Sequence, residues 1–250
     1  MKALITGASS GIGRDMAREL AKRGIDLILV ARRTDRLEEL KKELACHVEI
    51  IRCDLGTAEN CRALYEKITA EGGDIDILIN NAGFGLFGAF DQTELDTELA
   101  MIDLNIRALH ILTKLFLRDF KARNSGYILN VASSAAFLPG PLMAAYYATK
   151  NYVLRLTEAI WEELRREGSG VSVSVLCPGP VQTEFNQTAG GKFAIQGLTS
   201  GFVAEYAIRK MFARKMVILP GTLMKLFRFG EHFVSEKFLL RCAYRIQNGK

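Results

Sequence analysis

The sequence of 250 residues predicts an α/β fold built on a doubly wound parallel sheet. Short apolar, β-branched runs alternate with longer amphipathic helical patterns, which is the order expected of strands joined by helical crossovers. The first apolar run leads directly into a glycine-rich turn. Because no linker, repeat or low-complexity segment divides the chain, we expect a single domain over residues 1–250.

Seven runs have the length and composition of strands that are buried on both faces of a sheet. Each holds five to seven residues, most of them apolar and many β-branched. Helical crossovers between successive runs would make the sheet parallel. In chain order, the predicted strands are 2–6, 26–31, 48–53, 76–80, 127–132, 171–177 and 216–220.

The segments between these runs follow helical patterns, and a further stretch extends beyond the last strand. Residues 222–250 are rich in Leu and Phe and carry interspersed Lys and Arg, so we expect a helical tail. A tail packed on the domain, a subunit contact and a membrane-surface helix are all compatible with this composition. The other predicted helices lie within 14–24, 34–45, 58–72, 94–121 and 152–168.

Composition excludes several classes of protein. Hydrophobic residues make up 49% and charged residues 24%, as in ordinary globular proteins, and a net charge of +5 does not suggest nucleic-acid binding. The five cysteines lack paired spacing and the three histidines are scattered, so we expect reduced thiols, no metal site and a cytoplasmic location. We expect no signal peptide at the glycine-broken start and no transmembrane segment in the uncharged stretch 124–149.

Gly7, Gly11 and Gly13 lie where the first predicted strand turns into a helix. Positions without side chains let the backbone approach a pyrophosphate, and a helix N-terminus offers N–H donors to the same group. The GxxxGxG spacing differs from the commoner GxGxxG fingerprint. The turn therefore predicts a dinucleotide site, with a ligand-free Gly/Ser turn as the alternative.

Arg32 and Arg33 directly follow the second predicted strand. An acidic residue there would bind the ribose 2′-hydroxyl of NAD(H), whereas cations suit the 2′-phosphate of NADP(H). Asp35 is the competing carboxylate but lies further beyond the strand. The sequence thus favours NADP(H) over NAD(H), unless the two arginines are only solvated side chains before a helix.

Residues 144–150, AAYYATK, place two tyrosines just before a lysine. Residues four apart lie about 40° out of line on a helix and residues three apart about 60°. Geometry therefore prefers Tyr146 over Tyr147 as the partner of Lys150, and only mildly. The alternative is an aromatic core residue beside a solvated lysine.

Seven motifs in sequence resemble the short-chain dehydrogenase/reductase family over nearly the whole chain. In that family a serine stands 13 residues before the active tyrosine, and Ser133 has this relation to Tyr146, not to Tyr147. Each motif alone is weakly specific, but all seven in order are highly specific. They are TGASSGIG at 6–13, CDL at 53–55, NNAG at 80–83, Asn105, Ser133, YYATK at 146–150 and PGPVQTEF at 178–185.

The resemblance implies a catalytic set of Asn105, Ser133, Tyr146 and Lys150. Tyr146 would be the general acid in ketone reduction and the base in the reverse direction. Its ordinary pKa of about 10 would fall by about three units beside an ammonium about 4 Å away, with help from the nicotinamide charge. Ser133 would donate to the substrate carbonyl, Lys150 would bind the nicotinamide ribose, and Asn105 would hold a water that supplies protons.

The resemblance also implies a Rossmann-type fold and a full set of cofactor-binding residues. Asp54 would contact the adenine, the turn at 81–83 would lie under the adenosine ribose, and Val181 and Thr183 would bind the carboxamide. Family members often pair through helices matching 94–121 and 146–167, so we expect a homodimer or homotetramer. The implied cofactor residues are Gly7, Ser9, Ser10, Gly11, Ile12, Gly13, Arg32, Arg33, Asp54, Leu55, Asn81, Ala82, Gly83, Tyr146, Lys150, Pro178, Gly179, Val181 and Thr183.

Together these features predict an NADP(H)-dependent oxidoreductase that interconverts a lipophilic ketone and a secondary alcohol. Residues 184–201 would form a substrate lid, and the tail departs from reductases that end just after the last strand. Two alternatives stay open: an NADPH-binding sensor with little turnover, and a membrane-peripheral reductase of lipid or steroid ketones. Measured ketone turnover would distinguish the sensor from an enzyme. Binding to vesicles would distinguish the membrane-peripheral reductase from one that does not contact membranes.

Overall fold

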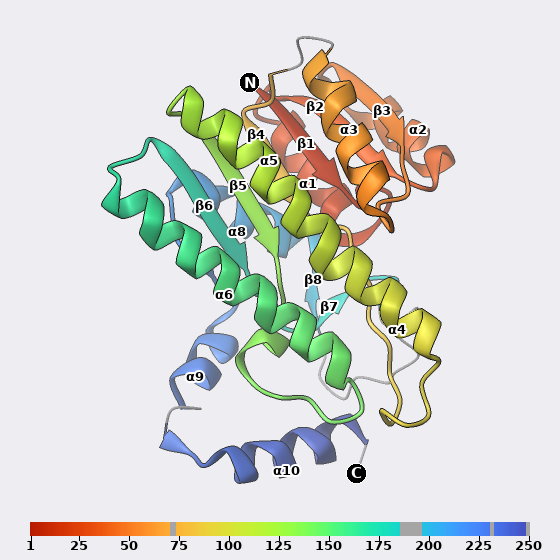
Figure 1. Ribbon diagram of the computed structural model, residues 1–250, viewed down its shortest axis with the longest axis vertical. Helices are drawn as coiled ribbons and strands as arrows, with labels where there is room; N and C mark the ends of the chain where they lie inside the picture. The colour runs from red at the N-terminus through yellow and green to blue at the C-terminus, as the bar shows by residue number, and fades with distance from the viewer. Residues whose placement is uncertain (71–73, 186–196, 231–232, 249–250) are drawn as a thin grey trace.

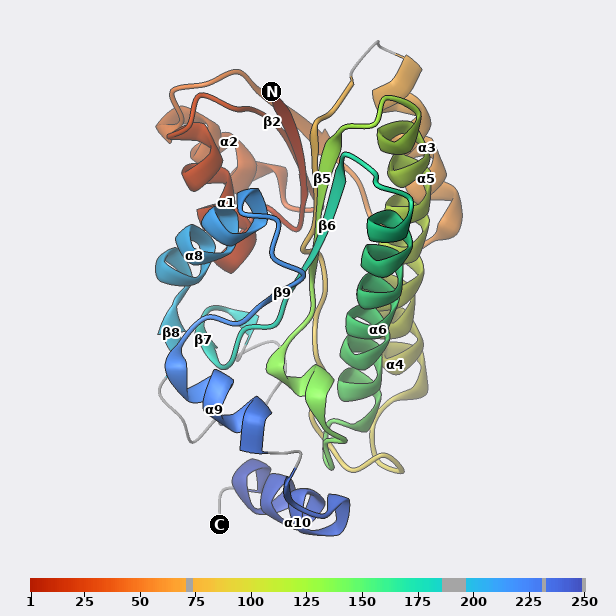
Figure 2. The same ribbon diagram turned by 90° about the vertical axis from the view of Figure 1, so that its left-hand side faces the viewer.

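In the computed structural model, seven parallel strands form one sheet with helices on both faces (Figures 1 and 2). The structure describes residues 1–70, 74–185, 197–230 and 233–248. Within these residues the strand order is β3-β2-β1-β4-β5-β6-β9. The strands are β1 (Lys2–Thr6), β2 (Asp26–Ala31), β3 (Val48–Arg52), β4 (Ile77–Asn80), β5 (Gly126–Val131), β6 (Val171–Leu176) and β9 (Val217–Ile218).

Apolar side chains on alternate sides of each strand explain why the predicted runs form a sheet buried on both faces. In β1, Ala3 and Ile5 pack into one hydrophobic cluster, whereas Leu4 packs into the cluster on the opposite face. All seven predicted strands are found. The last is shorter than predicted, because only Val217 and Ile218 pair with β6.

The helices form one layer on each face of the sheet. Helices α1 (Gly11–Ala21), α2 (Thr34–Glu43) and α8 (Ser200–Phe212) cover one face (Figure 2). The other face carries α3 (Ala58–Ala70), α4 (Leu95–Ile102), α5 (Leu109–Ala122) and α6 (Ala144–Arg166). A turn of π-helix (Asp103–Ala108) joins α4 to α5, and a 3₁₀ turn (Ser134–Phe137) lies between β5 and α6.

The tail forms two helices, α9 (Thr222–Gly230) and α10 (Glu236–Gln247), as its composition predicted. They lie at the end of the molecule beyond the carboxyl ends of the strands (Figures 1 and 2). The predicted lid at 184–201 is only partly seen, since 186–196 lie outside the described residues. Its flanks form a short parallel pair, β7 (Val181–Gln182) with β8 (Leu198–Thr199).

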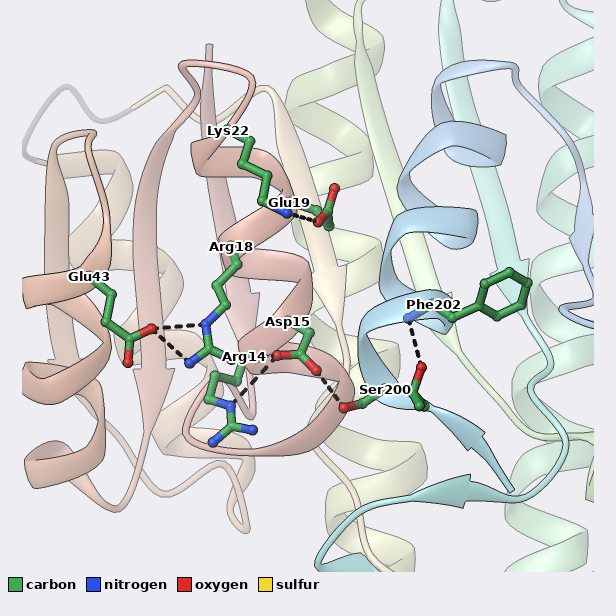
Figure 3. Close-up of polar contacts among 9 residues, drawn as sticks. Arg14, Asp15, Arg18, Glu19, Lys22, Glu43, Ser200 and Phe202 are labelled. Atoms are coloured by element: carbon green, nitrogen blue, oxygen red, sulfur yellow. Dashed lines mark hydrogen bonds and ion pairs between the residues drawn. The ribbon is translucent and has the colours of Figure 1, made fainter. Parts of the chain in front are cut away.

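A polar cluster connects three helices on one face of the sheet (Figure 3). Asp15 of α1 is 8% exposed, and its Oδ1 accepts a hydrogen bond of 2.7 Å from Arg18 Nη1. Its Oδ2 accepts another from Ser200 Oγ at the start of α8, and Arg18 also bonds Glu43 of α2. Asp15 therefore links the start of α8 to the helix that follows the glycine-rich turn.

We expect Asp15→Ala to lower the free energy of unfolding by about 1–3 kcal/mol, because Ser200 and Arg18 lose a nearly buried acceptor. For a domain of this size, the corresponding drop in Tm is about 2–12 °C. The control is Lys22→Ala, which removes the ion pair between Glu19 and a lysine whose side chain is 70% exposed, and which should change stability by less than about 0.5 kcal/mol. Equal melting temperatures for the two variants would contradict the prediction.

Candidate active site

A cavity of about 820 Å³ opens at the carboxyl ends of the strands. The strand order reverses between β1 and β4, which is where ligands bind in open parallel sheets. One part of the cavity is formed by the glycine-rich turn and the end of β2, and another part by α9 and α10 of the tail. A long ligand with a charged and an apolar end fits this layout.

The glycine-rich turn approaches the end of β4 too closely for side chains. A Cβ on Gly7, whose φ is +65°, would lie 2.8 Å from Ala82 Cα. A Cβ on Gly13 would lie 2.3 Å from Asn81 Nδ2, which donates to the carbonyls of Thr6 and Gly7. The turn thus presents bare backbone and the N-terminus of α1 to the cavity, which fits the pyrophosphate of a dinucleotide.

The structure brings almost all sequence-predicted site residues to this cavity. Gly13 and Asn105 are not on its wall: Gly13 packs behind the turn, and Asn105 lies beneath the site. Within the described residues, no group of three or more His, Cys, Asp or Glu could hold a metal ion. The predicted residues on the wall are Gly7, Ser9, Ser10, Gly11, Ile12, Arg32, Arg33, Asp54, Leu55, Asn81, Ala82, Gly83, Ser133, Tyr146, Lys150, Pro178, Gly179, Val181 and Thr183.

The two arginines after β2 differ in their surroundings. Arg33 Nη2 donates to Ser9 Oγ at 3.3 Å and Ser10 Oγ at 3.2 Å, so its guanidinium lies against the glycine-rich turn. The Arg32 side chain is 73% exposed and lies 4.0 Å from the Asp54 carboxylate. Both guanidinium groups line the cavity, where either could bind a phosphate group.

Tyr146 is buried in an apolar cluster, and its phenol lies beside the Ser133 side chain. Burial raises the pKa of the Tyr146 phenol, and Ser133 lowers it by less. In the protein alone, loss of hydration therefore sets the direction of this shift. The expected lowering by Lys150 together with the nicotinamide charge stays a prediction for the cofactor-bound protein. Near neutral pH the phenol is protonated. Tyr147, in contrast, accepts a hydrogen bond from Gln247 of α10.

Lys150 places a cation inside the fold. Its side chain is 6% exposed, and its Nζ donates to the Val131 carbonyl at 3.0 Å and lies 5.8 Å from the centre of the Tyr146 ring. Burial lowers the pKa of Lys150 to about 8. The ammonium is thus charged at neutral pH but close to losing its proton.

Asn105 lies in the π-helical turn and connects two parts of the site. Its Nδ2 donates to Phe84 O at 2.9 Å and to Thr149 Oγ1 at 3.1 Å, and its Oδ1 accepts from Phe84 N at 3.1 Å. A Cβ on Gly83 would lie 2.7 Å from Asn105 Oδ1 and 3.5 Å from Lys150 Nζ. The amide therefore holds the end of β4 against the residue that precedes Lys150, and π-helical turns are frequent at such sites.

Sequence reasoning missed the part of the wall that the tail provides. In α10, Leu239, Cys242, Ala243 and Ile246 follow helical i, i+3, i+4, i+7 spacing and face the cavity, so this spacing was a usable signal. Arg36 and Glu184 were also missed, because their contact joins segments 148 residues apart. Unpredicted residues on the wall include Phe84, Phe87, Met143, Tyr147, Met224, Phe227 and Gln247.

Comparison with known proteins agrees with this arrangement. The pattern of the family described as short chain dehydrogenase matches residues 1–192. The chain belongs to the short-chain dehydrogenase family. This chain is 33% identical over 241 residues to an NADP-dependent 3-hydroxy acid dehydrogenase of Schizosaccharomyces pombe. The aligned region covers 88% of this chain and 90% of that protein.

Two solved structures share the fold of this dehydrogenase. A short-chain dehydrogenase from Sphingobium yanoikuyae in complex with NADPH has a TM-score of 0.81 and 31% identity, over 94% of this chain and 96% of that chain. One from Burkholderia phymatum in complex with NAD has a TM-score of 0.83 and 25% identity, over 93% and 92%. The dehydrogenase is therefore an oxidoreductase that acts on CH–OH groups, and its relatives include NADPH- and NAD-bound proteins.

We expect Lys150→Met to raise the free energy of unfolding at pH 7 by about 1–2 kcal/mol, because it removes a charge that burial disfavours. The folded pKa of about 8 lies below the ordinary value of about 10.4, so the unfolded chain binds more protons between these values. The contribution of Lys150 to the wild-type free energy of unfolding therefore rises with pH between these two values. The extra stability of Lys150→Met over wild type shrinks over the same range.

Thermal melts of wild type and Lys150→Met at pH 7, 8, 9 and 10 measure this effect. The control is Lys22→Met, the same substitution at a side chain 70% exposed. A Lys150→Met protein that melts below wild type at pH 7 would show that the buried ammonium stabilises the fold.

Proposed function

We propose that this dehydrogenase uses NADP(H) to interconvert a lipophilic ketone and a secondary alcohol, with Tyr146 as general acid and base. The observation that carries the proposal is that Tyr146 and Ser133 lie beside each other on the wall of the cavity. Arginines lie in one part of that cavity and apolar tail residues in another. A carbonyl beside the pair would have a proton donor and a second hydrogen-bond donor within reach.

The buried phenol explains how the proton would move. The bound nicotinamide supplies hydride in reduction and accepts it in oxidation. In reduction, Tyr146 donates its proton to the carbonyl oxygen, and the raised pKa keeps this phenol protonated at neutral pH. Ser133 donates to the same oxygen and holds it in place. In oxidation, Tyr146 must first lose its proton, which a positive charge nearby favours.

We assign the supporting roles to Lys150 and Asn105. Lys150 would bind the nicotinamide ribose, and its charge would stabilise the Tyr146 phenolate during oxidation. Asn105 would hold a water that supplies protons through Lys150. The closeness of Gly83 to Asn105 supports this arrangement, since a Cβ there would lie 2.7 Å from Asn105 Oδ1 and only a glycine leaves that amide undisturbed.

The preference for NADP(H) rests on the cations beside the glycine-rich turn. Arg33 lies against Ser9 and Ser10, and Arg32 is exposed at the end of β2. Guanidinium groups bind phosphate through paired hydrogen bonds, whereas a ribose hydroxyl gains little from them. The NADP-dependent and NADPH-bound relatives support the same preference.

The apolar wall supports a lipophilic substrate. Phe84, Phe87, Met143 and Phe185 surround Tyr146, and α9 and α10 add more apolar side chains to the cavity. A carbonyl with large apolar substituents would remove this surface from water at about 25 cal/mol per Å².

For assembly and location, we propose a cytoplasmic homodimer or homotetramer. The family resemblance supports an oligomer through α4–α5 and α6. Free thiols at all five cysteines suit a reducing compartment. Among the described residues, no helix has the length and apolarity needed to cross a bilayer.

The tail has a second feature, an outer surface suited to contact with an anionic membrane. Six Lys or Arg and two Glu lie in residues 222–250, so this segment carries most of the net charge of +5. Basic residues beside exposed apolar ones favour the interface of anionic lipids. The tail residues that have exposed large apolar side chains and lie outside the cavity wall are Leu226, Phe229, Phe233, Val234, Phe238 and Tyr244.

Replacing Tyr146 by Phe tests the catalytic proposal. We expect NADPH-dependent ketone turnover to fall by about 10²–10⁴-fold, because the proton donor is lost while the ring still fills its site. The control is Tyr152→Phe on the same helix, whose hydroxyl bonds His110 away from the cavity and whose loss should leave turnover within about two-fold of wild type. Undiminished turnover in Tyr146→Phe would refute the assignment.

Vesicle co-sedimentation tests the tail surface. We expect wild type to bind vesicles containing anionic lipid, and the double variant Phe229→Glu/Phe233→Glu to lose at least about half of the bound fraction. Phe90→Glu is the matched control, since Phe90 is 70% exposed but lies outside the tail. Equal binding of all three proteins, or none by wild type, would exclude membrane contact through the tail.

A further inference from the structure

Glu184 lies between two arginines beside the glycine-rich turn. Its Oε2 accepts a hydrogen bond of 3.1 Å from Arg33 Nη1, and its Oε1 accepts one from Arg36 Nη1. Arg33 Nη2 simultaneously donates to Ser9 and Ser10. The Glu184 carboxylate therefore sits on the cationic edge of the cavity, next to the residues that would bind a phosphate.

This carboxylate is charged but only loosely held. Hydrogen bonds from Arg36 and Arg33 keep the pKa of Glu184 below its ordinary value, so the group is an anion at neutral pH. The three side chains are between 38% and 45% exposed, and ion pairs at such exposure contribute little to stability. A more highly charged ligand can displace the carboxylate without a large loss of folding energy.

We propose that Glu184 is a specificity-determining residue that competes with the 2′-phosphate of NADP(H) for Arg33 and Arg36. The inference rests on the proposed dinucleotide site and adds to it both Glu184 and Arg36. A phosphate monoester carries about −1.5 to −2 charges at neutral pH and offers three acceptor oxygens, against one charge and two oxygens on the carboxylate. The phosphate therefore takes over the arginines, and Glu184 weakens its binding by repulsion.

The competition acts on only one of the two cofactors. NAD(H) has an uncharged hydroxyl where NADP(H) has the phosphate, so it neither displaces Glu184 nor is repelled by it. Glu184 thus reduces the preference for NADP(H) over NAD(H) that the arginines create. If Glu184 instead held Arg33 and Arg36 in place for the phosphate, removing its charge would weaken NADPH binding. The sign of the change decides between the two roles.

The test uses Glu184→Gln, which keeps the size of the side chain and removes its charge. Dissociation constants for NADPH and NADH are measured by titration with wild type and variant. We expect the Kd for NADPH to fall about three- to ten-fold, while the Kd for NADH stays within about two-fold. Because the interaction is electrostatic, the gain should shrink when salt rises to 1 M.

The matched control is Glu43→Gln. Glu43 is also a half-exposed carboxylate bonded to an arginine, Arg18, but it lies outside the cavity wall. The Glu43→Gln variant should have the same dissociation constants for NADPH and NADH as wild type. A second variant, Arg36→Ala, should raise the Kd for NADPH about three- to ten-fold and leave that for NADH within about two-fold.

Each outcome has a defined meaning. An unchanged or higher Kd for NADPH in Glu184→Gln overturns the role of Glu184, and an unchanged Kd in Arg36→Ala removes Arg36 from the phosphate site. Failure of the proposed cofactor preference is separate, because it shows in wild type alone as NADH binding as tightly as NADPH. If wild type bound neither dinucleotide, both proposals would fall together.

Discussion

Seven parallel strands end at one edge of the sheet, and the strand order reverses between β1 and β4. The chain leaves β1 toward α1 on one face and leaves β4 toward α4 on the other, so a crevice forms where these connections diverge. The bare backbone at Gly7 lies in this crevice, against Ala82 beyond β4. Each further part of the site, from Arg33 to Tyr146, is positioned by the end of a neighbouring strand or by the helix that follows it.

Within that crevice, the buried ammonium of Lys150 lowers the stability of the fold. An ammonium and a phenol are buried side by side, the first with a lowered pKa and the second with a raised one. Neither shift would arise on the surface, because hydration would restore ordinary values. Buried ionisable groups without a compensating countercharge reduce stability, and such groups cluster at catalytic sites. The apolar packing that opposes the charge on Lys150 is also the packing that would receive a lipophilic ligand.

Two asparagines and two glycines hold this region together at short range. Asn81 bonds the backbone of the glycine-rich turn, and Gly13 leaves it room. Asn105 bonds Phe84 and Thr149, and Gly83 leaves that amide room. In both places an amide side chain takes the place of backbone pairing at a strand end, where the ladder has stopped. The glycine-rich turn and α6 are thereby each joined to the segment that follows β4 by an asparagine side chain.

The choice of Tyr146 through its spacing from Ser133 follows from the family resemblance and stays a prediction. The sequence by itself determined the seven strands and the turn at Gly7. These are local features: apolar periodicity shows which face is buried, and a glycine pattern shows where backbone must be bare. The spacing of Leu239, Cys242, Ala243 and Ile246 marks one apolar face of α10, but only the tertiary structure decided that this face lines the cavity and that Glu184 meets Arg33. The tertiary structure also decided that burial raises the pKa of Tyr146 in the protein alone. The reason is that contacts between distant segments, and the loss of hydration they cause, depend on packing in three dimensions, which no pattern along the chain encodes.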